Sequence, residues 1–402
     1  MTMRVLILFV MCTCVGCWAP AHAQLPQRTM DYKALAKRIV DQLQLEPDEK
    51  VMALAQPGMF EDFVPHFRYA VMQAGAIDMG VIDVLDPPYP ADWEESVIRK
   101  GFADATAAYV EMLEDIDAAV MMPGANPALP AYKALQILLQ EKKGPRRTIH
   151  FHWTDQYSPS GNVTGLTGVN VLPGHPAPPM QNIDIVYQNA VLNTDLDALD
   201  THQDRFIAAL RDGEVRVTSP AGTDIRFKAG NRDIIQQNGD ASAARMRQGA
   251  PLLDREVEIP GGAVRVAPIE NTVQGQVVYP YSAWNGHSVR NATVIYEDGR
   301  IVGVRADEGE EHLRAEIDNA PDDAKWFREF ALGFNPLLSM DVTNTWIGYY
   351  GYGAGIVRLG IGNNGELGGA VSGRYFRWRD LLTDCNVTID GEVWLKDGKF
   401  VR

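Results

Sequence analysis

The chain has 402 residues and a formal net charge of −15, with 46% hydrophobic and 22% charged residues. A chain of this length is too long for one compact core, so we expect two domains. Binding to phosphate groups requires a concentrated basic surface, and here acids outnumber bases along the chain. The charge therefore argues against nucleic acid and against anionic membrane surfaces as partners.

The first 23 residues are typical of a secretory signal peptide. Arg4 precedes the apolar stretch VLILFVMCTCVGCW, and the small-residue sequence AHA ends at Ala23. This pattern predicts cleavage after Ala23 and a secreted or periplasmic protein. Lipidation of Cys17 is the alternative, although Cys14 is an unfavourable residue three positions earlier. The apolar run is short for a bilayer, and we expect no membrane span later in the chain.

Cysteine usage is consistent with this processing. Three of the four cysteines lie in the predicted signal peptide, and only Cys385 remains in the mature chain. An internal disulfide and a thiolate metal site are therefore both excluded, and stability must come from the hydrophobic core.

The first part of the mature chain alternates between helical and strand-like segments. Leu35, Ile39, Val40 and Leu43 recur with helical spacing, which predicts a helix over 31–43. Further helices are predicted over 60–75, 93–116 and 128–144, and strands over 50–56, 76–85, 117–124 and 146–153. This alternation is typical of a Rossmann-like α/β domain with a parallel sheet. We assign it to residues 24–190.

The pattern changes in the second part of the chain. Residues 158–182 are rich in Gly, Pro and Asn and are predicted to form a long loop, and a helix follows over 195–213. Short alternating runs then dominate, at 214–219, 224–230, 263–268, 276–280 and 288–306, with one helix over 308–320. Their Asp-Gly, Asn-Gly and Gly-Gly pairs are typical of hairpins. Residues 191–402 are therefore predicted to form a β-rich α+β domain.

Three carboxylates in this second domain are candidates for a metal site. Glu270 lies in APIENTVQG, Glu329 in WFREFALGFNP and Asp380 in RYFRWRDLL. A single acid at the end of an element usually faces water. Three acids in one domain could converge on a hard cation, because Mg²⁺, Ca²⁺ and Mn²⁺ prefer oxygen ligands.

A weaker alternative metal site lies in the first domain. His150 and His152 are two residues apart on a predicted strand, so both rings project from one face. This pair could bind a divalent metal, with Asp155 as a third ligand. The competing interpretation is structural, since polar side chains at the carboxyl end of a parallel strand often bond to a neighbouring loop.

Five segments, in order, resemble the aminopeptidase T (leucyl aminopeptidase) family of metallopeptidases. They are SPAGTDIRF with NRDI, PGGAVRVAPIENTVQG, EFALGFNP, GAGIVRLGIGNN and VTIDGEVWLKDGKFV. The resemblance covers the chain from about residue 215 to the end, and the amino-terminal half fits loosely. It implies release of N-terminal residues from peptides and a homodimer with a cleft between domains.

The family builds a dinuclear metal site from two glutamates, two histidines and one aspartate. By resemblance the acids fall on Glu270, Glu329 and Asp380. The histidine positions hold Arg358, in GIVRLGIG, and Trp378, in WRD. Arginine carries a permanent positive charge and tryptophan is not a metal ligand, so these two positions do not supply the imidazole ligands of the ordinary two-metal mechanism.

A single divalent metal (Zn, Co, Mn or Mg) remains an alternative. The carboxylates would hold it, with help from His150, His152 or His287. The other alternative is that no metal binds. The sequence does not identify a catalytic residue.

Three functional hypotheses follow. The first is a secreted metal-dependent hydrolase with an altered ligand set, acting on small peptides. The second is a non-catalytic protein that binds a small molecule or peptide, since a guanidinium and an aromatic ring can hold a carboxylate-bearing or aromatic ligand. The third is a relative of the iron-dependent ring-cleaving dioxygenases, which share the fold of the aminopeptidase family.

Overall fold

The computed structural model describes most of the chain. The described residues are 30–56, 60–83, 89–151, 153, 170–171, 180–338, 346–347, 351–373, 375–377 and 380–401. The predicted signal peptide, His152, Asp155 and Trp378 lie outside them. Within the described residues, no helix is both long and apolar enough to cross a membrane.

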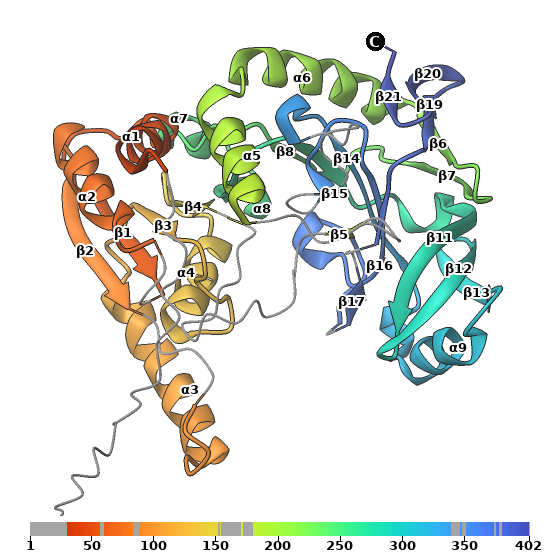
Figure 1. Ribbon diagram of the computed structural model, residues 1–402, viewed down its shortest axis with the longest axis horizontal. Coiled ribbons are helices and arrows are strands. Elements are labelled where there is room, and N and C mark those ends of the chain that lie inside the picture. The colour runs from red at the N-terminus through yellow and green to blue at the C-terminus, as the bar shows by residue number, and fades with distance from the viewer. Residues whose placement is uncertain are drawn as a thin grey trace, which may run out of the picture.

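The amino-terminal half contains a parallel sheet flanked by helices (Figure 1). Its strand order is β2-β1-β3-β4-β9, and every neighbouring pair is parallel. The predicted α/β class is therefore confirmed. The strands are β1 (Lys50–Ala55), β2 (Ile77–Asp83), β3 (Ala118–Met121), β4 (Arg147–Phe151) and β9 (Glu256–Ile259), and the helices are α1 (Tyr32–Leu43), α2 (Phe63–Gln73), α3 (Glu95–Met112) and α4 (Pro130–Gln140).

Both faces of this sheet are packed. Val51 and Ala53 of β1 belong to one hydrophobic cluster together with residues of α1 and α2. Met52 and Leu54 of the same strand belong to a different cluster together with residues of α4. Alternate side chains of a strand point to opposite faces, so the sheet has a core on each side.

The fifth strand comes from a distant part of the sequence. β9 begins at Glu256, after the helices α5 (Met180–Asn193), α6 (Leu196–Asp212), α7 (Ala243–Arg247) and α8 (Leu252–Arg255). The amino-terminal sheet is therefore completed by residues beyond the predicted boundary at 190. The boundary itself stays a prediction.

The carboxyl-terminal half is rich in antiparallel strands, as predicted. One sheet has the order β17-β16-β14-β10-β8, with β18 also pairing with β16, and a second has the order β13-β12-β11-β7-β6-β19-β20-β21. The first contains β8 (Ile234–Gln237), β10 (Ala263–Val266), β14 (Phe327–Gly333), β16 (Val357–Gly362), β17 (Phe376–Arg377) and β18 (Leu381–Leu382). The second contains β6 (Glu214–Thr218), β7 (Asp224–Lys228), β11 (Gln274–Trp284), β12 (His287–Glu297), β13 (Arg300–Arg305), β19 (Asn386–Ile389), β20 (Glu392–Lys396) and β21 (Lys399–Phe400).

One large core lies between these two sheets, α6 and α9 (Glu310–Asn319). It includes Phe206 of α6, Phe227 of β7, Phe330 of β14 and Leu313 of α9. β7 buries alternate residues and exposes the others. This burial pattern accounts for the alternation of polar and apolar residues in the sequence of the strand. A small sheet pairs β5 (Asn170–Val171) with β15 (Trp346–Ile347).

Candidate functional site

Glu329 lies in β14, the strand between β10 and β16, and is fully buried. Arg265 of β10 and Arg358 of β16 both pair in register with Ala331, two residues further along β14. Residues i and i+2 of a strand share a face, so both arginines lie diagonally across from Glu329 on that face. The strand register thereby brings two guanidinium groups to one carboxylate.

Three arginines contact the Glu329 carboxylate. Arg265 Nε donates to Oε2 at 3.1 Å, and Arg358 donates to the same oxygen from Nη2 at 3.3 Å. Arg328 Nε lies 3.3 Å from Oε1, and the other end of its guanidinium binds Glu366 and the Asn363 carbonyl. Burial would raise the pKa of Glu329, but Arg265, Arg358 and Arg328 outweigh it and hold the pKa far below its usual range.

Gly360 of β16 makes room for this cluster. A Cβ atom at that position would lie 3.1 Å from Cγ of Glu329 and 3.2 Å from Cδ of Arg328. Such contacts are tighter than ordinary van der Waals separation. A larger residue would therefore push against two members of the ion-pair cluster.

Glu270 makes its own set of contacts, at the start of the short 3₁₀ helix η1 (Glu270–Thr272) between β10 and β11. Arg232 pairs with Oε2, while the backbone amide of Ala370 donates to Oε1 at 2.8 Å and Asn364 Nδ2 at 3.2 Å. Burial would raise the pKa of Glu270, but the Ala370 amide, the Arg232 charge and the Asn364 bond together lower it.

Asp380 forms a third separate ion pair. Arg377 Nε lies 2.5 Å from Oδ2 and Arg377 Nη2 donates to Oδ1 at 2.9 Å. The same guanidinium stacks 3.6 Å above the Trp284 ring and reaches Glu316 at 3.4 Å. Burial raises the pKa of Asp380 despite the neighbouring Arg377.

His150, the weaker metal candidate, is buried at the carboxyl end of β4. The Tyr132 hydroxyl lies 3.1 Å from its Nδ1 and 3.0 Å from its Nε2, and Glu258 of β9 lies 3.6 Å from Nδ1. Burial lowers the pKa of His150, but the Glu258 carboxylate more than offsets it, so the pKa is raised. These contacts support the structural interpretation of His150, in which its ring bonds to neighbouring side chains.

The predicted site is therefore only partly brought together. Arg358 pairs with Glu329, as expected for a cation at the metal position. The three acids Glu270, Glu329 and Asp380 instead each bind different arginines. Within the described part of the chain, no group of three or more His, Cys, Asp or Glu residues could hold a metal ion. The oxygens that resemblance assigns to a dinuclear metal already accept from guanidinium groups. The described donor set does not fit that metal centre.

Two of the arginines on Glu329 were not among the predicted site residues. Arg265 alternates with buried valines in AVRV, and Arg328 directly precedes Glu329. A charged residue inside a strand with buried neighbours is itself a signal of a buried partner, because an unpaired buried charge is costly.

The carboxyl-terminal half matches the family model of the thermophilic metalloproteases (M29) over residues 196–344. Among solved structures, AmpT from Thermus thermophilus is similar, with a TM-score of 0.59 and 19% identity over 92% of this chain and 99% of that one. A 2,5-dihydroxypyridine dioxygenase from Pseudomonas putida is similar, with a TM-score of 0.56 and 14% identity over 92% and 96% of the two chains. No curated protein sequence matches the chain. At these identities the two structures support the fold alone.

Proposed function

We propose that this protein binds a small carboxylate-bearing molecule or short peptide, on the fold of a metalloaminopeptidase, without metal-assisted hydrolysis. The observation that carries this proposal is that, within the described residues, three arginine guanidinium groups contact two carboxylates, Glu329 and Glu366, so positive charge is in excess among these five side chains and an incoming carboxylate would balance it. One of these arginines, Arg358, occupies the sequence position at which the family resemblance places a metal-binding histidine. A guanidinium supports carboxylate recognition rather than water activation, because it offers planar paired donors and cannot bind a metal.

The test combines metal analysis with calorimetry on the purified chain. We expect substoichiometric Zn, Co and Mn, no release of leucine from leucyl-p-nitroanilide with or without added metal, and binding of the dipeptide Leu-Gly. Arg358→Gln should weaken dipeptide binding about tenfold, or ~1.4 kcal/mol. Arg305→Gln on the exposed side of β13 is the matched control and should bind like the unmodified chain. Stoichiometric metal together with hydrolysis would overturn the proposal.

The second candidate is a metal-dependent aminopeptidase. It is favoured by the match of residues 196–344 to the metalloprotease family model, since that span contains Glu270 and Glu329. The arginines would then have to release these acids when metal binds. Saturable hydrolysis that requires one added metal, and that Glu329→Gln abolishes, would favour this candidate over the first.

We also propose export and dimer formation. The sequence of residues 1–23 supports signal-peptide cleavage, and mass spectrometry of the exported protein should find Gln24 as its first residue. The homodimer rests on the family resemblance, and analytical ultracentrifugation tests it.

A further inference from the structure

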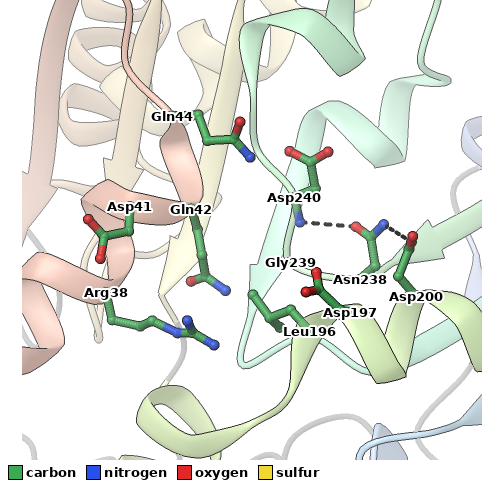
Figure 2. A pocket seen from close by; sticks show the side chains of 10 residues that line it. All are labelled: Arg38, Asp41, Gln42, Gln44, Leu196, Asp197, Asp200, Asn238, Gly239 and Asp240. Carbon is green, nitrogen blue, oxygen red and sulfur yellow. Dashed lines mark hydrogen bonds between the residues drawn. The ribbon is translucent and has the colours of Figure 1, made fainter.

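A pocket of about 230 Å³ lies between α1, the start of α6 and the turn that follows β8 (Figure 2). It is remote in sequence from the predicted metal-site residues, none of which lines it. The backbone amide of Ala241 donates to the Gln42 carbonyl at 3.0 Å, which fixes the turn against the end of α1. Gly239 forms part of the wall with a φ of 85°, and a Cβ there would lie 2.8 Å from Nε2 of Gln42.

Gln42 supplies an orphaned hydrogen-bonding group in this pocket. Its side chain lines the cavity, the residue is only 6% exposed, and its Oε1 atom has no hydrogen-bond partner among the described residues. In Figure 2 the Gln42 amide projects from α1 with its nitrogen on the side of Leu196 and Gly239 and its oxygen on the side of Arg38. A buried polar group without a partner costs about 1–3 kcal/mol, so a ligand that satisfies it gains correspondingly.

The charged groups of the pocket are mostly acceptors. Asp197 makes no hydrogen bond or ion pair within the described residues, and Asp200 accepts from Asn238 Nδ2 at 2.6 Å through Oδ1. The Oδ1 atom of Asp240 accepts from the Ser242 amide at 2.8 Å. Within the part of the chain that the structure describes, the second carboxylate oxygens of Asp200 and Asp240 have no such bond, so the pocket retains acceptors for incoming N–H groups.

Two of the three guanidinium nitrogens of Arg38, the cationic side chain that lines the pocket, are engaged with backbone carbonyls. Arg38 donates from Nε to the Val191 carbonyl at 3.2 Å and from Nη2 to the Thr194 carbonyl at 2.8 Å. It thereby satisfies carbonyls at the carboxyl end of α5. The pocket therefore offers negative charge and unfilled acceptors to a ligand, and this combination selects a cation that carries hydrogen-bond donors.

We propose that this pocket binds a small organic ammonium ion, an aliphatic amine or diamine, between the two halves of the chain. A bare metal ion fits less well, because no three acids among the described residues are placed to hold one. The pocket, with a volume of about 230 Å³, has room for a small organic ion, and the Leu196 side chain offers an apolar contact for an alkyl stem. The ammonium groups would bind Gln42 Oε1 and the Asp197, Asp200 and Asp240 carboxylates.

Calorimetry with 1,4-diaminobutane on the full chain tests this assignment. We expect one bound diamine per chain. Asp197→Asn, which removes an exposed charge, and Gln42→Met, which removes the amide at similar volume, should each weaken binding at least about tenfold. Asp212→Asn removes a charge from the exposed carboxyl-terminal end of the same helix and should leave the affinity unchanged.

Two comparison titrations distinguish a diamine site from a metal-ion site and from a site for simple ammonium. Calcium chloride and ammonium chloride at the same concentrations should not compete with the diamine, since the site recognises donors spaced along an alkyl chain. Thermal unfolding without ligand shows whether each variant is folded. The proposal is overturned if no diamine binds, if Asp197→Asn and Asp212→Asn weaken binding equally, or if calcium binds stoichiometrically at this pocket.

Discussion

Arg358 Nη2 lies 3.3 Å from Glu329 Oε2, and the two side chains are 3% and 0% exposed. They come from adjacent antiparallel strands, so backbone hydrogen bonds on both sides of β14 fix their separation. Guanidinium groups are permanently charged, so the charge of Glu329 is compensated by side chains of the fold itself.

Glu329→Gln is expected to destabilise the protein by about 3–5 kcal/mol. The substitution leaves Arg265, Arg328 and Arg358 without the buried carboxylate that they share, and breaking a buried pair by removing one partner typically has this cost. Urea unfolding followed by circular dichroism measures it. Glu297→Gln, an exposed glutamate on β12, should change stability by less than about 0.5 kcal/mol. Equal stability of the two variants would show that Glu329 does not hold the arginines together.

Restoring both imidazoles should produce measurable zinc binding. Arg358→His with Trp378→His supplies two neutral nitrogen donors and removes one competing charge from Glu329. Complete structural zinc sites are worth on the order of 10 kcal/mol. Arg265 and Arg328 still bind Glu329 in this variant, so we expect affinity well below that limit, with a Kd of roughly micromolar or weaker.

Zinc titration by calorimetry compares this double variant with the unmodified chain. Tight zinc binding by the unmodified chain would contradict our interpretation of the two substitutions. No binding by either protein would show that the pocket has diverged at more than these two positions. Arg305→His with Trp93→His is a matched control, since both side chains are exposed and neither contacts Glu329.

The sequence predicted many of the helices and strands, namely those whose residues have a strong period. Tyr32–Leu43 has apolar residues at helical spacing, and Asp224–Lys228 alternates buried and exposed residues. Strands β14 and β16 were not predicted, because every residue in them is buried and no alternation marks them. β9 was missed because Glu256–Ile259 is short and its parallel partner, β4, lies about a hundred residues earlier. Helix α5 was missed because it begins at Met180, inside the segment predicted as a loop.

The site was less predictable than the fold. The pairing of Arg358 with Glu329 could be anticipated, since a cation placed at a metal position needs a counter-charge. The contribution of Arg265 could not, because it depends on the register of β10 against β14. Residue spacing along the chain carries no information on which residues of two distant strands become neighbours.

Arg147→Met is expected to cost about 3–5 kcal/mol of stability. Arg147 is fully buried, binds both oxygens of Glu49 at 2.6 and 2.8 Å, and donates to the Ala241 and Leu43 carbonyls at 2.8 and 3.0 Å. Methionine leaves the Glu49 charge and both carbonyls without these donors. Urea unfolding measures the loss, and Arg226→Met on the exposed face of β7 is the control. A loss below about 1 kcal/mol would show that water replaces the guanidinium.

The final prediction concerns the pH dependence of stability that His150 introduces. Its pKa is raised, because the Glu258 and Glu256 carboxylates together outweigh the effect of burial, which alone would lower it. A raised pKa means that the folded state binds the proton more tightly than the unfolded state. The stabilisation is then fully present below the ordinary histidine pKa of about 6.5 and is lost as the pH rises through the folded pKa.

We therefore expect the thermal midpoint to fall as the pH rises from 6 to 9, and His150→Gln and Glu258→Gln should both flatten this slope. His66→Gln, which alters an exposed histidine on α2, should leave the slope unchanged and serves as the control. Differential scanning calorimetry across the pH range makes the measurement. A slope that survives in both His150→Gln and Glu258→Gln would assign the pH dependence to other groups, and a slope of opposite sign in the unmodified chain would mean that burial, rather than the carboxylates, controls the proton on His150.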